Sequence, residues 1–183
     1  VAHLQERKDV EVLTFCHSDD IATLDSLVKE VGFIFHLAGV NRPQHIQEFK
    51  TGNAGLTEAL CASVASSGRN IPVIYTSSIQ AELDNAYGSS KRDAENALNA
   101  LCADHGVDVH VFRLPNVFGK WARPNYNSAV ATFCHNIVHN LPISINDANA
   151  KISLVYIDDV VSHFIAVMDG KHSGNASVSV EPV

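Results

Sequence analysis

Short apolar runs alternate along this chain with longer amphipathic stretches. Each apolar run has the length of a β-strand and ends in small or polar residues, whereas the stretches between them repeat apolar residues at helical spacing. This alternation is typical of a doubly wound parallel sheet with helices on both faces. We expect strands over 10–15, 31–39, 70–77, 107–115 and 152–157, and helices over 46–67, 88–101, 128–141 and 160–168.

Small or hydroxyl-bearing residues follow two of the expected strands. Ala38-Gly39 ends the run that starts at Val31, and Ser77-Ser78 ends the run that starts at Val73. In a doubly wound sheet, ligands bind outside the carboxyl ends of the strands. The two ends are therefore expected to form one site, whereas Tyr75, inside its strand, is expected in the core.

Tyr87-Gly-Ser-Ser-Lys91 follows the second of these strands after a short loop. A helix over 88–101 places Tyr87 and Lys91 on one face, because residues four apart are neighbours there. A nearby ammonium favours the phenolate, so we expect Lys91 to lower the pKa of Tyr87 toward the range of a general acid or base. Ser78 is expected to hold the substrate oxygen, with Ser77 as the alternative. A surface tyrosine beside a solvated lysine has the same spacing, so the motif depends on its context.

The composition agrees with a globular domain. With 183 residues and 46% hydrophobic residues, the chain is long enough to bury one core. The net charge of -7 and the lack of a basic tract argue against a nucleic-acid partner. The apolar runs are far shorter than the roughly 20 residues that cross a bilayer, and no signal-peptide pattern opens the chain. We therefore expect a cytoplasmic protein without a membrane partner.

The cysteines and histidines form no disulfide or metal-binding pattern. The 4 cysteines are widely spaced and include no Cys-x-x-Cys pair, which is typical of buried thiols in a reducing compartment. Cys134-His135 with His139 has helical spacing, but no third ligand is evident, so no metal is expected.

The amino-terminal residues predict a chain that starts inside a dinucleotide-binding fold. Residues 1–8 are typical of the end of a helix, and 10–15 of the second strand of such a fold. No G-x-x-G-x-x-G occurs, although that turn normally places backbone N–H groups against the cofactor pyrophosphate. We expect a fragment that lacks the first strand with its Gly-rich turn and that is also trimmed behind Val183.

Six motifs occur in a specific order and spacing. They are His36-Leu-Ala-Gly39, Gly52-Asn53 with Thr57, Tyr75-Thr-Ser-Ser78, Tyr87-x-x-x-Lys91, Arg113-Leu-Pro-Asn-Val-Phe-Gly119 and Val155-Tyr-Ile-Asp-Asp-Val160. Through them nearly the whole chain resembles the extended short-chain dehydrogenase/reductases that act on nucleotide sugars. The resemblance implies a Rossmann-like doubly wound α/β fold.

Longer strings are similar to one branch of that family. They are His36-Leu-Ala-Gly-Val-Asn-Arg-Pro43, Ser77-Ser-Ile-Gln-Ala81, Phe118-Gly-Lys-Trp-Ala-Arg-Pro-Asn-Tyr-Asn-Ser128 and Ala131-Thr-Phe-Cys134. The branch contains capsule and O-antigen enzymes that reduce a UDP-4-keto-6-deoxy-L-hexosamine on the way to UDP-N-acetyl-L-fucosamine. In those proteins a metal-binding cupin domain follows the reductase domain, and these residues contain nothing cupin-like. The resemblance therefore implies a cupin domain in the full-length protein.

The resemblance also implies how the residues divide between cofactor and substrate. Residues 1–183 would be a partial NAD(P)-binding domain, with substrate-lobe segments at about 116–152 and 171–183. Implied cofactor-binding residues are Leu37, Ala38, Gly39, Asn53, Tyr87, Lys91, Leu114, Pro115 and Val117. Implied substrate-binding residues are Arg42, Ser77, Ile79, Gln80, Asn116, Arg123 and Asn127. Arg42 and Arg123 are candidate cations for the diphosphate, because a guanidinium binds phosphate bidentately, although either also fits a solvated surface position.

Several expectations concern the segments that flank these motifs. Asp158 or Asp159 is expected to cap the helix over 160–168. The candidate linker is 170–175, and 176–180 is expected to form a small strand of the substrate lobe or the start of a segment that is absent.

The cofactor is NADP (NADPH) or NAD. An acidic residue at the end of the second strand would bind the ribose of NAD, and a basic one would receive the phosphate of NADP. The strand over 10–15 is followed by Cys16-His-Ser18, and Asp19-Asp20 fit better as the cap of the next helix together with Ser18. His17 and Ser18 therefore favour NADP, as does the resemblance, although His17 also fits an ordinary surface position.

The resemblance, taken with these motifs, implies reduction of the C4 ketone of a UDP-4-keto-6-deoxy-N-acetylhexosamine. Tyr87 supplies the proton, Lys91 lowers its pKa and holds the nicotinamide ribose, and Ser78 binds the carbonyl oxygen. A 4-epimerase or dehydratase of the same family is one alternative, although Ile79-Gln80 in place of acidic residues disfavours a dehydratase. A non-catalytic nucleotide-binding protein on the same fold is the other. The family also implies a homodimer, paired through the helices over 52–67 and 87–103.

Overall fold

The computed structural model describes residues 1–171, 176–178, 180 and 182. In this part of the chain a main sheet contains 4 parallel strands in spatial order. They are β1 (Ile34–His36), β2 (Val73–Ser78), β3 (Val109–Leu114) and β6 (Ala176–Val178). The strands expected over 31–39, 70–77 and 107–115 are confirmed, with shorter bounds.

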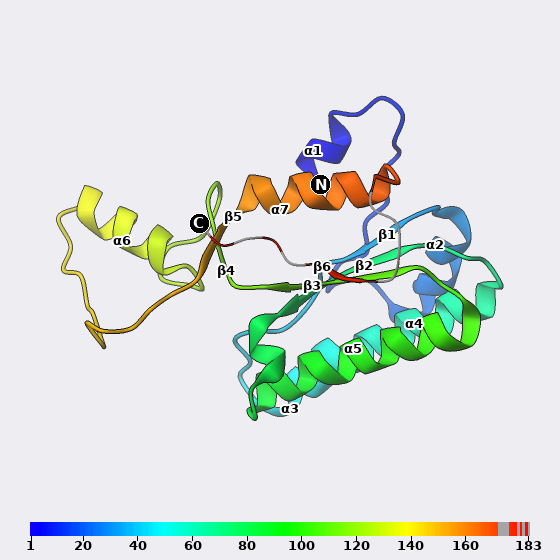
Figure 1. The fold of residues 1–183 in the computed structure, drawn as a ribbon, viewed down its shortest axis with the longest axis horizontal. Helices are drawn as coiled ribbons and strands as arrows, with labels where there is room; N and C mark the ends of the chain where they lie inside the picture. The colour runs from blue at the N-terminus through cyan, green and yellow to red at the C-terminus, as the bar shows by residue number, and fades with distance from the viewer. Residues whose placement is uncertain (172–175, 179, 181, 183) are drawn as a thin grey trace.

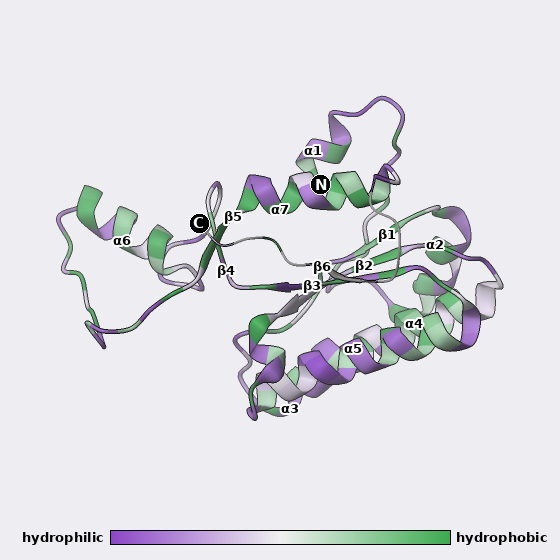
Figure 2. Cartoon of the chain, in the orientation of Figure 1, coloured by the Kyte–Doolittle hydropathy of each residue, from purple (hydrophilic) through white to green (hydrophobic). Residues whose placement is uncertain are grey.

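Helices cover both faces of the main sheet (Figure 1). α2 (Leu24–Glu30), α4 (Leu56–Ser67) and α5 (Ala86–His105) lie on one face, and α7 (Ile157–Met168) lies on the other. Figure 2 shows that α5 and α7 each carry both hydrophobic and hydrophilic residues, as helices with one buried face do. The expected doubly wound α/β fold is thereby confirmed.

Successive residues of the central strands pack into two separate clusters. Val73 and Tyr75 of β2 pack with α4 and α5. Ile74, between them, packs with Phe112 of β3 and Phe164 of α7, whose rings lie 4.7 Å apart. Because side chains alternate across a strand, a parallel sheet covered on both faces needs apolar residues at consecutive positions.

A two-stranded parallel sheet continues from the end of β3. β4 (Asn116–Phe118) pairs with β5 (Leu154–Tyr156), and the crossover between them contains α6 (Ala129–Val138). Ser128 caps α6 by accepting from the backbone N–H of Ala131 at 3.2 Å. No residue of α6 is buried, and Figure 1 shows α6 projecting from the main sheet with the segment that returns to β5.

The helix expected over 46–67 is continuous but not regular. It begins as α3 (Gln47–Phe49), widens into the π-helical segment η2 (Lys50–Gly55) and continues as α4. π-Helical turns are rare and are frequently found at functional sites. This one contains Asn53, whose buried side chain bonds the turn after β1.

The strand expected over 10–15 is wrong. The structure has no helix or strand between α1 (Ala2–Gln5) and the 3-10 turn η1 (Ile21–Thr23). A strand requires ladder hydrogen bonds to a neighbour, and within the described residues β1 forms that edge of the main sheet. Phe15 nevertheless packs against the core. The cap of η1 is Asp20 alone, whose Oδ1 accepts from Ala22 N at 3.0 Å.

Two expectations near the carboxyl end are also corrected. Neither Asp158 nor Asp159 caps α7, and Asp158 instead pairs with Lys120 at 2.8 Å. Of the strand expected over 176–180, Ala176–Val178 forms β6 in the main sheet beside β3, not in a separate lobe. Residues 172–175 of the expected linker lie outside the described residues.

The cysteines are all free, but they are not all buried. Cys16 and Cys134 are exposed, which corrects the expectation of four buried thiols, whereas Cys61 is buried and Cys102 is half-buried. In the part of the chain that the structure describes, no helix has the length and apolar character to cross a membrane.

Gly88 allows the first turn of α5 to pack closely on the preceding loop. A Cβ here would lie 2.2 Å from the Gln80 carbonyl oxygen and 2.7 Å from that of Leu83. Backbone atoms cannot give way as a flexible side chain can, so we expect Gly88→Ala to lower the free energy of unfolding by about 1–3 kcal/mol despite the better helix propensity of alanine. Chemical denaturation measures this change. Gly32→Ala is the matched control, because a Cβ there meets nothing within 4 Å, and equal losses in both variants would contradict the contact.

Candidate active site

α5 places three polar residues against the face of β2. Tyr87, Lys91 and Glu95 stand four residues apart on this helix, so their side chains share one face. The 3-10 turn η3 (Ile79–Glu82) connects the end of β2 to the start of α5. Ser78 and Tyr87 are thereby brought together across a short loop.

Tyr87 is half-buried, and its hydroxyl is hydrogen-bonded to Ser78. Burial raises the pKa of Tyr87 above its usual value, and the Ser78 hydrogen bond opposes this shift. The expected lowering of this pKa by Lys91 is wrong, because the ammonium bonds β2 instead. At neutral pH the phenol is therefore protonated and suited to donate a proton.

Lys91 is only 5% exposed. Its Nζ donates to the Thr76 carbonyl oxygen at 2.9 Å and to Tyr75 Oη at 3.2 Å, and it lies 4.8 Å from the centre of the Tyr75 ring. Burial lowers the pKa of Lys91 to about 8, and the Glu95 carboxylate opposes this shift. Among the described residues, these bonds use two of the three Nζ donors.

A buried histidine lies behind Tyr75. His36 stacks on the Tyr75 ring with 5.1 Å between centres, and its Nε2 lies 2.8 Å from Thr57 Oγ1. Burial and, secondarily, the Lys91 charge lower the pKa of His36 to about 4, so the imidazole is neutral at pH 7. Thr57 Oγ1 gives its own proton to the Asn53 carbonyl oxygen at 2.8 Å, so His36 Nε2 is the donor to Thr57.

Asn53 stabilises the turn after β1. Its Oδ1 accepts from Val40 N at 2.8 Å, and its Nδ2 donates to Val40 O at 3.0 Å and to Ser90 Oγ at 2.9 Å. A Cβ at Gly39 would lie 2.8 Å from Asn53 Oδ1 and 3.2 Å from Lys91 Nζ, so glycine permits this close approach. Asn53 is 1% exposed and therefore lies beneath the turn, where it positions the backbone.

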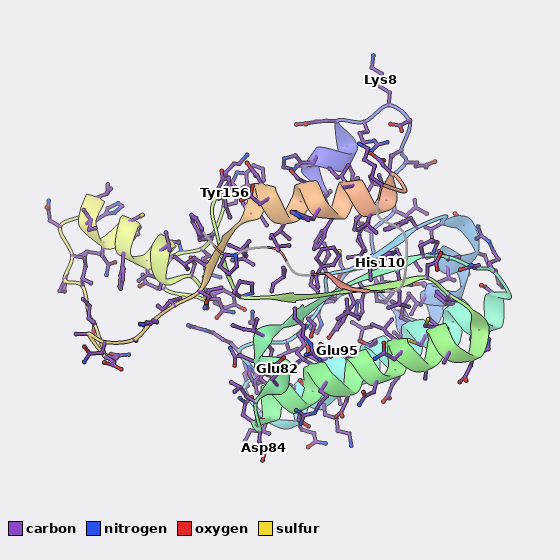
Figure 3. All side chains as sticks on the ribbon, in the orientation of Figure 1. Lys8, Glu82, Asp84, Glu95, His110 and Tyr156 are labelled. Carbon is purple, nitrogen blue, oxygen red and sulfur yellow. The ribbon has the colours of Figure 1, made fainter. Side chains whose placement is uncertain are left out.

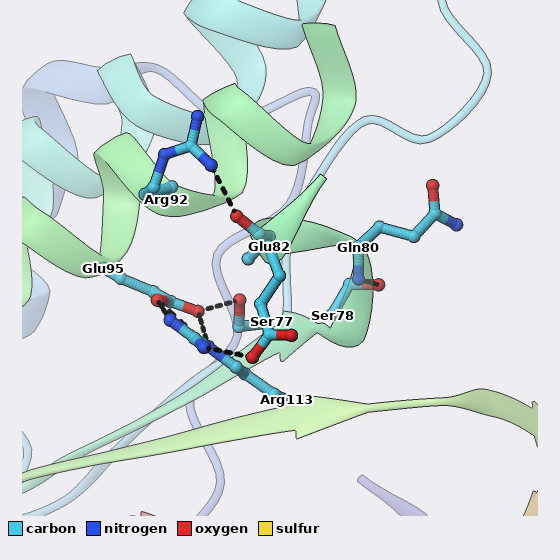
Figure 4. Close-up of polar contacts among 8 residues, drawn as sticks. Ser77, Ser78, Gln80, Glu82, Arg92, Glu95 and Arg113 are labelled. Carbon is cyan, nitrogen blue, oxygen red and sulfur yellow. Dashed lines mark hydrogen bonds and ion pairs between the residues drawn. The ribbon is translucent and has the colours of Figure 1, made fainter. Parts of the chain in front are cut away.

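Ser77 belongs to a buried polar cluster (Figure 4). Its Oγ donates to Glu95 Oε1 at 2.5 Å, and Glu95 accepts two bonds from the Arg113 guanidinium. Arg113 also pairs with Glu82 at 3.1 Å, and Figure 3 shows Glu82 and Glu95 together on the α5 side of the sheet. A buried carboxylate requires such partners. Ser77 is thus committed to this cluster, and Ser78 is the hydroxyl that meets the tyrosine.

A second group of the expected residues lines a cavity of about 460 Å³ at the start of α6. Its lining residues are Arg42, Asn116, Asn125, Tyr126, Asn127, Ser128, Ala129, Thr132 and Phe133. Arg42 Nε donates to Asn127 Oδ1 at 2.8 Å, and its guanidinium lies 5.2 Å from the centre of the Tyr126 ring. Arg123 lies 5.9 Å from the same ring but does not line the cavity. A guanidinium surrounded by amides and hydroxyls suits a phosphate or a sugar.

The remaining expected residues divide by exposure. Those at the carboxyl ends of β1 and β2 are exposed: Leu37, Ala38, Gly39, Ile79 and Gln80. Leu114 is instead buried in the cluster under α7, and half-buried Val117 packs against that cluster. Pro115 is half-buried as well. The side chain of Leu114 therefore serves packing.

His135, in the last turn of α6, and His139, the residue after that helix, contact each other. The two rings lie 4.2 Å apart, and His139 Nδ1 bonds the His135 carbonyl oxygen at 2.8 Å. Within the residues that the structure describes, no group of three or more His, Cys, Asp or Glu side chains could hold a metal ion.

The fold and this arrangement of serine, tyrosine and lysine define a class of nucleotide-cofactor enzymes. Residues 1–180 match the model of the NAD dependent epimerase/dehydratase family, so the chain belongs to that family. The expected oxidoreductase family is confirmed.

One curated protein and two solved structures show which members of the family this chain is similar to. A curated protein of Pseudomonas aeruginosa, named UDP-2-acetamido-2,6-beta-L-arabino-hexul-4-ose reductase, is 61% identical over 181 residues, which are 99% of this chain and 49% of that protein. The crystal structure of the capsular polysaccharide assembling protein CapF from Staphylococcus aureus has a TM-score of 0.84 and 36% identity, covering 98% of this chain and 49% of that one. The NAD complex of UDP-glucuronic acid 4-epimerase from Bacillus cereus, at 18% identity, shares the fold with a TM-score of 0.75, covering 90% of this chain and 60% of that one. The chain thus spans about half the length of the first two relatives.

Sequence reasoning missed the polar residues that surround Lys91. Glu95 could have been found from the sequence, because it continues the four-residue spacing of Tyr87 and Lys91. No sequence pattern indicated the contact between His36 and Thr57, because it joins β1 to α4 across the sheet face. Tyr75 was correctly placed in the core, but its bond to Lys91 was not foreseen.

His36 makes the folded chain sensitive to acid. Its pKa of about 4 lies below the 6.5 of an unperturbed histidine. Between these values the unfolded chain binds a proton that the folded chain does not, so the free energy of unfolding falls as the pH drops from 6.5 toward 4. From pH 7 to pH 5 we expect a loss of about 2 kcal/mol from this group. His36→Gln, which keeps an N–H donor for Thr57, should remove that part.

Denaturant titrations at pH 7 and pH 5 measure the difference between wild type and His36→Gln. His45→Gln, at an exposed position, is the control and should keep the wild-type acid sensitivity. The same acid sensitivity in all three proteins would rule out the buried histidine as the cause.

Proposed function

We propose that this chain forms the catalytic part of a nucleotide-sugar reductase, which uses NAD(P)H to reduce the C4 ketone of a UDP-4-keto-6-deoxy-N-acetylhexosamine. The observation that carries the proposal is the grouping of three side chains at the end of β2, with Ser78 bonded to Tyr87 and Lys91 one helical turn away on α5. The name of the Pseudomonas aeruginosa relative supports the substrate class.

Reduction of a ketone requires a proton at the carbonyl oxygen as the new bond to hydrogen forms at C4. Tyr87 Oη is suited to supply this proton, because burial keeps the phenol protonated at neutral pH. Ser78 Oγ is placed to donate to the same oxygen. Lys91, one helical turn away, would hold the nicotinamide ribose. The C=O group becomes CH–OH, and solvent returns a proton to Tyr87.

The carboxyl end of β1 fits a nicotinamide dinucleotide, which would supply the hydride when bound. Gly39 lies exposed beside Lys91 Nζ, and a side chain in its place would meet that nitrogen. Lys91 keeps one N–H donor beyond its bonds to β2, which suits a ribose hydroxyl. Leu37, Ala38, Pro115 and Val117 would flank the same ligand.

We assign NADPH as the preferred form of the cofactor. Asp19 Oδ2 accepts from Cys16 N at 2.6 Å and Asp20 caps η1, and these local bonds disfavour either carboxylate as the ligand of the NAD ribose. His17 and Ser18 are exposed and suit the additional phosphate.

We assign the substrate diphosphate to the cavity at the start of α6. Arg42 is its cation, and Asn116 and Asn127 add amide donors. Arg123, on the Tyr126 ring, suits a second contact to the nucleotide. Exposed Ile79 and Gln80, next to Ser78, would contact the sugar.

The proposal also covers the cellular location, the oligomeric state and the further domain of the full-length protein. We propose a cytoplasmic homodimer that pairs through α4 and α5 and carries a cupin domain in the remaining half of its length. Size measurement of the full-length protein in solution tests the dimer.

Turnover should depend on the Tyr87 hydroxyl. Tyr87→Phe removes the proton donor and keeps the ring, so we expect kcat to fall by about 10²–10⁴-fold while the affinity for NADPH stays unchanged. The assay follows NADPH absorbance in the full-length protein with the UDP-4-keto sugar. Tyr156→Phe, which removes a hydroxyl on β5, is the control and should keep wild-type turnover. Near-normal turnover of Tyr87→Phe would refute the assignment, and sugar isomers interconverting without net oxidation would identify an epimerase.

The rate should decline in alkaline solution as Lys91 loses its proton. The pKa of Lys91 is about 8, whereas that of Tyr87 is raised by burial, so the lysine titrates first. We expect kcat/KM to be constant below this value and to fall about tenfold per pH unit above it. Lys91→Arg should be slower but should lose this limb, because a guanidinium does not titrate there. An alkaline limb unchanged in Lys91→Arg would assign it to another group.

A further inference from the structure

Lys91 rests on a tyrosine that no part of the proposed reaction uses. Tyr75 is fully buried in β2, and its hydroxyl accepts from Lys91 Nζ at 3.2 Å. A hydroxyl in the core of a parallel sheet is costly unless it is fully hydrogen-bonded. A phenylalanine would fill the same space without that cost, so the hydroxyl itself requires an explanation.

Counting protons determines the direction of every bond in this cluster. Lys91 can only donate, so Tyr75 Oη accepts from it, and the Tyr75 proton must be given elsewhere. The Thr57 side chain interacts with the Tyr75 hydroxyl, and we assign it as the acceptor of this proton. Thr57 gives its own proton to the Asn53 carbonyl oxygen and therefore accepts from both Tyr75 and His36. The hydroxyl protons of Tyr75 and Thr57 and the Nε2 proton of His36 are each given to an acceptor in this order, and one Nζ proton of Lys91 remains outside it.

We propose that Tyr75 is a positioning residue, which holds the Lys91 ammonium in place and in its charged form through the bonds that run from Lys91 to Tyr75, Thr57 and His36. The inference rests on the proposed function, because it explains how the lysine of that mechanism stays charged inside the protein. Tyr75 itself does not touch the substrate.

The charged and titratable groups around Lys91 come from three elements. α5 supplies Glu95 and Tyr87, β2 supplies Tyr75 and the Thr76 carbonyl, and β1 supplies His36. Of these, Glu95 carries a full opposite charge, but Ser77 and Arg113 already share that carboxylate. The acceptors on β2 are therefore the direct partners that the described structure offers the ammonium.

Tyr75 and His36, the two other titratable members of this chain of bonds, are both neutral. Burial raises the pKa of Tyr75, so its phenol stays protonated and remains a donor to Thr57. Burial and the Lys91 charge keep His36 neutral. A protonated His36 would repel the Lys91 ammonium. Because His36 stays neutral, Lys91 is the one cation of this cluster in the described part of the chain.

The test removes one hydroxyl and measures the protonation of Lys91 directly. In the full-length protein, lysine Nζ and Cε signals are followed against pH by NMR, with Lys91→Gln used to assign the Lys91 signal. We expect the pKa of Lys91 to fall by about one unit in Tyr75→Phe, because a hydrogen bond to a charged group is lost. The alkaline limb of kcat/KM should shift by the same amount to lower pH.

Matched variants separate this role from general packing. Tyr156→Phe loses a hydroxyl elsewhere and should leave the Lys91 titration unchanged. Thr57→Val removes the acceptor of the Tyr75 proton and should also lower the pKa of Lys91, whereas Thr57→Ser should keep the wild-type value. A Lys91 titration in Tyr75→Phe identical to that of wild type overturns the proposal. If Tyr75→Phe does not fold, Thr57→Val decides by the same criterion.

The two readouts keep the two proposals apart. If the wild-type full-length protein shows no turnover with the UDP-4-keto sugar, the proposed reaction is refuted. The NMR titration needs no substrate, so it would still decide whether Tyr75 controls Lys91.

Discussion

The burial of the Lys91 ammonium between α5 and β2 is the constraint on which the site depends. A cation at 5% exposure is tolerated only with acceptors in the right places, and Thr76 O and Tyr75 Oη supply them from one strand. Because Lys91 stands in the middle of one helical face, these bonds also set the position of Tyr87 one turn before it. The bonds of Lys91 to β2 thus hold the helix that carries Tyr87.

The two neighbouring serines at the end of β2 have different tasks. Ser77 joins Glu95 and Arg113 in a buried cluster that attaches α5 to β2 and β3. Ser78 is left at the surface beside Tyr87. The two hydroxyls thereby meet different residues of the same face of α5, Glu95 for Ser77 and Tyr87 for Ser78. The rigid cluster under Ser77 supports the geometry that catalysis would require.

One short turn connects the surroundings of Lys91 to the cavity at the start of α6. Gly39 approaches Lys91 Nζ, and three residues later Arg42 lines the cavity and bonds Asn127. Asn53, from the π-helical segment, fixes this turn through both atoms of its amide. Cofactor and substrate recognition would therefore share one backbone support, whose position depends on the buried polar residues of α4 and β1.

The sequence by itself determined the parallel α/β architecture and the common face of Tyr87 and Lys91, because both follow from periodicity over a few residues. Through the family resemblance it also included Arg42, Asn116 and Asn127 in a larger set of candidate substrate residues, and the structure brought these three to one cavity. Only the tertiary structure decided which atoms Lys91 bonds, that Ser77 is bound to Glu95, and that residues 10–15 do not form a strand. These outcomes depend on partners that packing brings together from distant parts of the chain. Local spacing says where a side chain points, and the fold alone says what it meets there.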